Sequence, residues 1–343
     1  MSLNINSPRI IGLDLVRSIA ILFVISGHFF SLNTPFCSTI FGGGNLTLQS
    51  ITIPLFSTGV PLFLMLTGYL NANKSPSRKY YKGCIRVLFA YLLFSFITIL
   101  FRKYYLSEDL SWTQWILKIL DYSAIPYAWY IEMWIGLFLL TPFLNYMYKA
   151  IPSRRLKLTL LVTLYLLTAV PDLFNRYGMH IVPGFWSLTF PLMFFFAGSY
   201  IREYRPHPKK WFLIVAIILM CSINPIFNLL FVNHHTLIQI AGGYYGVFGT
   251  LIAIAFFLLI YDMNTQVTAI RVALTKISIL SLDMYLCCYM FDQLAYPYFL
   301  SHYFVDQSQF GPYFFIVVPL VFIGSFILAW GKDAVCKRIS PLL

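Results

Sequence analysis

Charged residues are scarce in this chain, and their scarcity excludes a soluble fold for most of its length. They make up 10% of the 343 residues, whereas hydrophobic residues make up 59% and aromatic residues 19%. Soluble domains typically contain about 25% charged residues. The apolar runs are about 20 residues long, as membrane-spanning helices are, and lack the alternation of barrel strands. We therefore predict an all-α integral membrane protein in which residues 1–343 form a single polytopic domain.

Several signatures of cofactor and metal chemistry are also missing. The sequence contains no P-loop, no GxGxxG and no HExxH motif, and its six cysteines form no CxxC pair. We expect no metal ion, and we interpret the cysteines as small apolar residues in or beside helices.

About ten apolar segments are long enough to cross a bilayer as helices. Between the third and fourth of them, residues 108–127 carry tryptophan, isoleucine and leucine at helical spacing, which predicts an amphipathic helix. This helix lies either in the outer membrane interface or against its neighbours. The predicted spans are residues 10–32, 51–70, 87–106, 127–148, 158–175, 185–201, 211–232, 240–261, 277–300 and 312–331.

The net charge of +12 is divided among separate clusters between the apolar segments. This distribution is typical of cytoplasmic loops, so we expect no nucleic-acid partner. The clusters follow every second span, and the loops on the opposite side hold only Arg102, Lys103, Lys118 and Arg176. By the positive-inside rule, both termini are cytoplasmic in a plasma (inner) membrane of the bacterial type.

The first predicted span contains three ionisable residues: Asp14, Arg17 and His28. A charge at the bilayer centre costs roughly 2.5 to 3.5 kcal/mol, so such residues usually face protein or water. Arg17 and His28 lie within about 20° of one helical face and roughly 16 Å apart along the axis. Asp14 lies one turn before Arg17 and is placed to pair with it. Considered alone, the charged pair could be a topology anchor, and the histidine could be a packing residue. Because they lie on one face of the same helix, we favour a functional role for that face.

Three carboxylates in other spans are candidates to orient the imidazole. Glu132 enters from the outside at a depth similar to that of His28, and aromatic residues surround it. We therefore predict Glu132 as the partner of His28, because a nearby carboxylate orients an imidazole. For Asp283 and Asp292 the simpler interpretation is solvation at a helix end or interhelical hydrogen bonding.

A basic pair marks the cytoplasmic start of the third span. Lys82 and Arg86 are four residues apart and share one helical face. Such a pair could hold the pyrophosphate or the 3′-phosphate of a nucleotide cofactor. Any cytoplasmic loop can also carry such a cluster.

The segment GLDLVRSIAILFVISGHF resembles the opening of the membrane-bound acyltransferase family 3, whose first helix carries an Arg, ten intervening residues and a His. Arg17 and His28 match that spacing. Further blocks resemble members that acetylate surface polysaccharides: WYIEMWIGLFLLTPFLN (129–145), FFFAGSYIREYRP (194–206) and ISILSLDMYLCCYMFD (277–292).

The resemblance implies transfer of an acyl group, usually acetyl from cytoplasmic acetyl-CoA, to a hydroxyl of an extracytoplasmic or lipid-linked glycan. It gives His28 the role of general base or transient acyl carrier, and Arg17 a role in holding the cofactor or the site. Many members carry an Arg-x-x-Arg motif at the third helix. Here Arg86 matches the second arginine, but Gly83 occupies the first position and Lys82 is the nearest cation.

Two other classes of protein remain possible from the sequence. A transporter or flippase for a glycan or its lipid-linked precursor would also use buried charges and an aromatic vestibule. A non-catalytic scaffold in a glycan-assembly complex would need neither Arg17 nor His28. The family blocks favour the enzyme, and so does the lack of a visible internal repeat.

Overall fold

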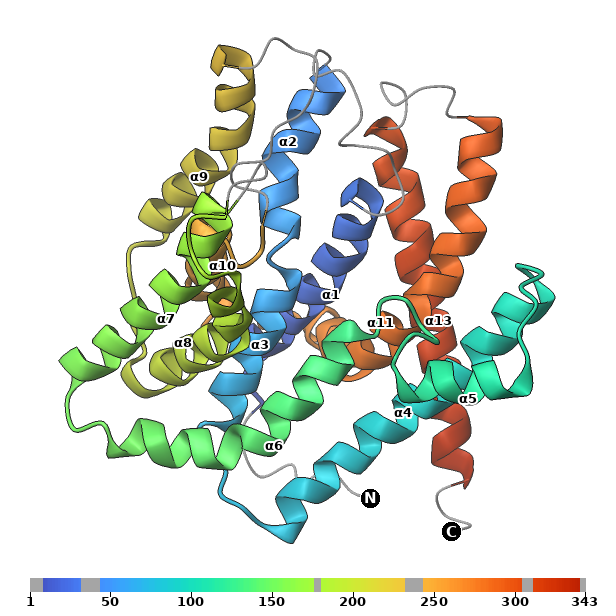
Figure 1. Cartoon of the computed structure of the whole chain (residues 1–343), viewed down its shortest axis with the longest axis horizontal. Coiled ribbons are helices and arrows are strands. Elements are labelled where there is room, and N and C mark those ends of the chain that lie inside the picture. The colour runs from blue at the N-terminus through green and yellow to red at the C-terminus, as the bar shows by residue number, and fades with distance from the viewer. Residues whose placement is uncertain (1–8, 32–43, 176–179, 232–242, 304–310, 340–343) are drawn as a thin grey trace.

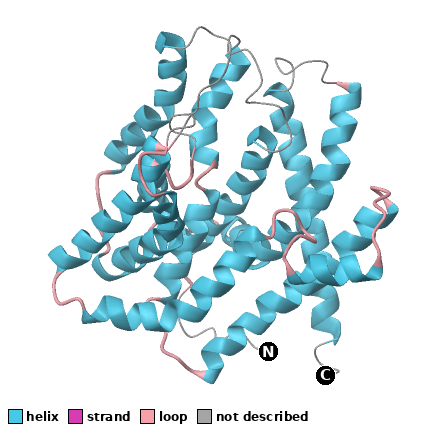
Figure 2. Cartoon of the chain, viewed as in Figure 1, coloured by secondary structure: helices cyan, strands magenta, loops and turns pink. Residues whose placement is uncertain are grey.

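The computed structural model describes residues 9–31, 44–175, 180–231, 243–303 and 311–339, and these residues form helices and their connections (Figure 2). Cys37 and Arg176 lie outside the described residues. The long helices are α1 (Ile11–Ser31), α2 (Gly44–Phe56), α3 (Gly59–Asn71), α4 (Arg78–Tyr104), α6 (Trp129–Ala150), α7 (Arg154–Phe174), α8 (Phe190–Tyr204), α9 (Lys210–Phe231), α10 (Val247–Ile260), α11 (Thr268–His302) and α13 (Phe314–Ile339), with the short α5 (Trp112–Leu120) between α4 and α6.

The predicted all-α membrane fold is confirmed. Within the described residues, eight segments are long and apolar enough to cross a membrane. The shorter apolar helix α10, together with α6, occupies the two remaining predicted positions, so the arrangement agrees with about ten spans. In Figure 1, α11 and α13 stand side by side, and α13 ends at the side of the molecule where the chain also begins.

The second predicted span is broken into two helices, α2 and α3, stacked end to end (Figure 1). Pro61 lies in the first turn of α3 and has no N–H to donate to the preceding turn. Hydroxyl groups bond carbonyls at the break: the Ser57 hydroxyl donates to Ile53 at 2.8 Å and that of Thr58 to Leu55 at 2.7 Å. Bonds of this kind allow a helix to be interrupted within a membrane.

Two glycines allow α3 and α8 to pack at backbone distance. A Cβ atom on Gly68 would collide with the carbonyl of Phe195, and one on Gly198 would collide with the carbonyl of Met65. Small residues at helix crossings have this role in membrane proteins. The crossing belongs to the main core, where α1 and α11 also bury apolar side chains.

The connection between α4 and α6 contains the predicted amphipathic helix, α5. Ser111 begins it with a capping box to Gln114, and Trp115 is buried while Trp112 is 73% exposed. The exposed face continues through Ile116, Leu117 and Leu120, so α5 packs on its neighbours with one side and offers an apolar face with the other.

The connection from α5 to α6 is held by Arg102. Its guanidinium donates to the carbonyls of Ser123 and Ala124, at 2.9 and 3.1 Å. It also pairs with Glu108 at 2.8 Å. These bonds fix the chain a few residues before Tyr127, which leads into the candidate site.

Candidate active site

His28 lies near the end of α1, with its side chain 12% exposed, and meets a carboxylate from α11. The Oδ2 atom of Asp292, whose side chain is fully buried, is 3.4 Å from Nδ1 of His28. A buried carboxylate next to an imidazole fixes the orientation of the ring. The pair joins the first helix to α11.

Tyr127 completes this cluster from the segment before α6. Its hydroxyl donates to Oδ2 of Asp292 at 2.9 Å. Its ring lies on the imidazole, with 4.0 Å between the ring centroids of Tyr127 and His28. The tyrosine therefore contacts both members of the pair, and it holds the carboxylate and the ring in one geometry.

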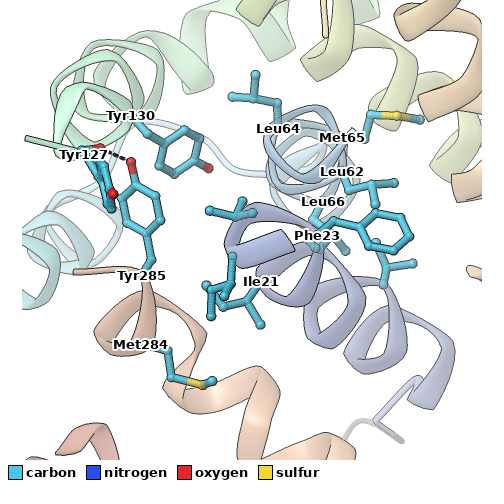
Figure 3. Packing of buried hydrophobic residues seen from close by; sticks show 14 of the residues in the cluster. Ile21, Phe23, Leu62, Leu64, Met65, Leu66, Tyr127, Tyr130, Met284 and Tyr285 are labelled. Atoms are coloured by element: carbon cyan, nitrogen blue, oxygen red, sulfur yellow. Dashed lines mark hydrogen bonds between the residues drawn. The ribbon is translucent and has the colours of Figure 1, made fainter. Parts of the chain in front are cut away.

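A second tyrosine supports Tyr127 from α11. The hydroxyl of Tyr285 donates to the backbone carbonyl of Tyr127, as the dashed line in Figure 3 shows. Tyr130 lies close by, and its ring centroid is 5.7 Å from that of Tyr285. Tyr127, Tyr130 and Tyr285 thus form a cluster of tyrosines next to the imidazole.

Cys288 is the other α11 group at the imidazole. Its Sγ atom lies 3.9 Å from Nδ1 of His28 and donates to the carbonyl of Tyr285 at 3.2 Å. The thiol and Asp292 approach the same ring nitrogen. A nucleophile and an orienting carboxylate must use opposite nitrogens of the histidine between them, so this geometry is not that of a Cys-His-Asp triad.

The prediction that Glu132 orients His28 is wrong. Glu132 is exposed on α6, and the carboxylate at the imidazole belongs to Asp292. The two acids lie at similar depths in the sequence pattern, but the rotation of α6 turns Glu132 outward and that of α11 turns Asp292 inward. Asp283 makes the interhelical bond expected of it, with both carboxylate oxygens 2.9 Å from Nζ of Lys332.

Arg17 borders an interior pocket of about 220 Å³ between α1, α3, α6 and α11. The polar groups of Thr67, Tyr130 and Tyr285 line it together with apolar side chains. Arg17 is partly buried, and among the described residues its guanidinium makes one hydrogen bond, to the hydroxyl of Ser278 at 3.5 Å. A partly buried guanidinium beside a pocket is suited to binding an anion.

A second hollow of about 420 Å³ lies on the other side of Arg17, where α1 begins. Arg9, Asp14 and Arg202 line it as well. Asp14 does not form the predicted ion pair with Arg17, because Arg9 takes the Asp14 carboxylate with two bonds of 2.5 and 2.8 Å, although the charge of Asp14 still acts on Arg17. Arg9 lies two residues before the start of α1 and can fold back onto the carboxylate, which leaves the Arg17 guanidinium facing the two hollows.

Lys82 and Arg86 are exposed on α4, and neither lines the two hollows next to Arg17. Val87, one residue further on, does border the interior pocket. The cation that the sequence analysis missed is Arg202 of α8, whose guanidinium lies 5.1 Å from the ring centroid of Tyr69. It stands in the block 194–206 that resembles the family, which was the available signal.

These features define a polytopic helical membrane protein with an imidazole–carboxylate pair near one end of α1 and an arginine-lined pocket toward the other. The sequence profile of the acyltransferase 3 family, described as an acyltransferase domain, matches residues 10–330. The chain therefore belongs to this family of acyltransferases. Searches of curated proteins and of solved structures give no match.

Proposed function

We propose that this acyltransferase moves an acetyl group from cytoplasmic acetyl-CoA to a hydroxyl of an extracytoplasmic or lipid-linked glycan. One observation carries the proposal: the two ends of a single helix present complementary chemistry. His28 and its carboxylate lie near one end of α1, and Arg17 borders two hollows toward the other.

The spacing along α1 suits the donor. Arg17 and His28 are separated by roughly 16 Å along the helix axis. The pantetheine arm of CoA has about twelve bonds between its phosphate oxygen and its sulfur, equivalent to about four extended residues or roughly 14 Å. With the phosphates at Arg17, the arm fits the interior pocket and brings the thioester to the tyrosine cluster next to His28.

Two routes of acyl transfer are compatible with this site. In direct transfer, Nε2 of His28 takes the proton of the acceptor hydroxyl, the oxygen attacks the thioester carbonyl, and the CoA thiolate leaves and receives the proton. In the covalent route, Nε2 attacks the thioester carbonyl and the CoA thiolate leaves. The acceptor hydroxyl then attacks the acyl-imidazole, the imidazole is released, and the hydroxyl proton passes through Nε2 to the thiolate. Asp292 on the Nδ1 side directs both routes to Nε2.

The surrounding residues have positioning roles in this proposal. Tyr127 and Asp292 hold the imidazole, and Arg17 binds donor phosphate. Lys82 and Arg86 would then attract the anionic donor to the membrane surface from their exposed positions on α4, since surface cations raise association rates.

The orientation of the protein follows from the charges of its loops. With both termini in the cytoplasm of a plasma (inner) membrane of the bacterial type, the Arg17 end faces the donor and the His28 end faces the acceptor. Residues 1–343 would then work as one membrane domain that passes an acyl group, rather than a whole substrate, across the bilayer.

Transfer is tested with the full chain reconstituted in liposomes. Radiolabelled acetyl-CoA is supplied on the cytoplasmic side together with lipid-linked glycan extracted from the organism's membranes. The wild type should place base-labile label on the glycan fraction, and His28→Ala should not, at equal protein content. Label on the glycan from His28→Ala would refute the catalytic assignment. Export of glycan without acetylation by the wild type would refute the proposal as a whole.

A further inference from the structure

A third hollow, of about 370 Å³, opens beside the one at the start of α1. Arg202 borders both hollows. The walls of the third come from the turn after α3, the end of α6, the start of α7 and the end of α8. Hollows of this size are typical of small-molecule sites, and this one has no role in the acyl-transfer steps described above.

The turn after α3 forms part of the wall of this hollow. The side-chain amide of Asn145, which is buried, donates to the carbonyls of Asn71 and Lys74 at 2.7 and 2.8 Å. These two bonds hold the turn that brings Asn73 to the wall. Ser199 of α8 adds a hydroxyl on the opposite side.

One cation of the wall is already neutralised. Nζ of Lys157 lies 2.8 Å from both carboxylate oxygens of Glu203. The same ammonium group lies 4.5 Å from the ring centroid of Tyr148. Lys157 and Glu203 therefore cancel each other's charge and stiffen the wall.

Two other cations of the hollow have no such partner. Arg202 and Lys149 make no ion pair with a carboxylate of the described residues, and Arg202 is only stacked near Tyr69. Arg17, one hollow further in, makes no ion pair with a carboxylate of the described residues either, since the nearby Asp14 is paired with Arg9. Cations without carboxylate partners thus follow one another from the interior pocket through Arg202 to Lys149, which is the pattern expected of a ligand with two separate phosphate groups.

We propose that Lys149 and Arg202 bind the 3′-phosphate of the donor nucleotide in this third hollow, while Arg17 and Arg202 share its pyrophosphate. The inference rests on the proposed function, because it takes the donor to be a coenzyme A thioester. With this site, the enzyme should prefer a donor whose nucleotide carries a 3′-phosphate over a phosphopantetheine thioester, which has no nucleotide. An anionic lipid headgroup offers similar chemistry, and the experiment separates the two.

The test compares CoA with dephospho-CoA as ligands of the purified full chain in neutral detergent, by calorimetry. The wild type should bind CoA roughly five- to tenfold more tightly, as expected for one charge-assisted contact with an exposed lysine. Lys149→Gln should remove this difference by weakening only CoA. Arg202→Gln should weaken both ligands. Arg155→Gln, at an exposed arginine that lines none of the three hollows, should change neither.

Each contrary outcome has a distinct meaning. Equal affinity of the wild type for CoA and dephospho-CoA, or an unchanged ratio in Lys149→Gln, overturns the 3′-phosphate site and leaves the proposed function standing. Loss of CoA binding upon addition of phosphatidylglycerol, with no dependence on the 3′-phosphate, assigns the hollow to a lipid headgroup. Failure of the wild type to bind either ligand overturns both the site and the proposed function.

Discussion

Nδ1 of His28 lies 3.4 Å from Oδ2 of Asp292, and the hydroxyl of Tyr127 donates to the same oxygen at 2.9 Å. Three elements that are distant in sequence, namely α1, the segment before α6 and α11, thus meet at one imidazole. A histidine alone in a membrane helix could be a packing residue. One held by a fully buried carboxylate has a defined ring orientation, which catalysis requires.

Asp292 should matter for turnover, and Glu132 should not. Asp292→Asn removes the charge that orients the His28 ring, so we expect kcat to fall by about a hundredfold or more. KM for the donor should stay nearly constant, because Asp292 lines none of the donor hollows. Glu132→Gln should keep kcat within about twofold of the wild type. Both variants are compared by transfer of radiolabel at equal protein content. An equal loss in the two variants would contradict the assignment of Asp292.

Tyr127→Phe should have a smaller effect than the loss of Asp292. The ring still packs on His28, but the carboxylate loses one hydrogen bond, worth about 1 to 2 kcal/mol for a charged acceptor. We expect kcat to fall roughly five- to thirtyfold. Tyr104→Phe, at a residue that is 75% exposed, is the matched control and should retain full activity. Full activity in Tyr127→Phe would show that the hydroxyl has no positioning role.

The close packing of α3 against α8 predicts that a substitution there changes the thermal stability of the protein and does not act through the candidate active site. Gly198→Ala places a methyl group against the backbone of Met65, and such overpacking costs about 1 to 3 kcal/mol. Thermal unfolding in detergent should shift to lower temperature. Gly136→Ala is the control, because nothing lies within 4 Å of the added carbon, and it should leave the transition nearly unchanged. Equal transitions for the two variants would show that the helices can separate at no cost.

The topology can be checked with reporter fusions. Green fluorescent protein fused after Leu343 should fluoresce, and alkaline phosphatase fused there should be inactive, because the C-terminus is expected in the cytoplasm. Fusions truncated at Asp109, in the connection before α5, should give the opposite result. A C-terminal phosphatase with full activity would reverse the orientation and with it the assignment of donor and acceptor sides.

Helix positions and the stripe on α1 could be predicted because they depend on local properties of the chain. The length of an apolar run decides whether it can span a bilayer, and the helical period places Arg17 and His28 on one face. The same reasoning predicted α5 from the spacing of its apolar residues. It missed the break between α2 and α3, although Pro61 lies in the middle of the predicted span 51–70, because a proline inside a membrane helix can kink the helix without dividing it.

The partners of these residues depended on tertiary structure. Glu132 and Asp292 have similar depth, and their order of preference reversed because the rotation of α6 and α11 about their own axes is set by packing with other helices. Asp14 had two arginines within reach, and the fold of the chain before α1 selected Arg9. Sequence alone thus determined an all-α membrane protein with Arg17 and His28 on one face of a helix. Only the tertiary structure decided which carboxylate meets His28 and that Arg202 joins Arg17, because side chains from separate helices meet only when those helices pack.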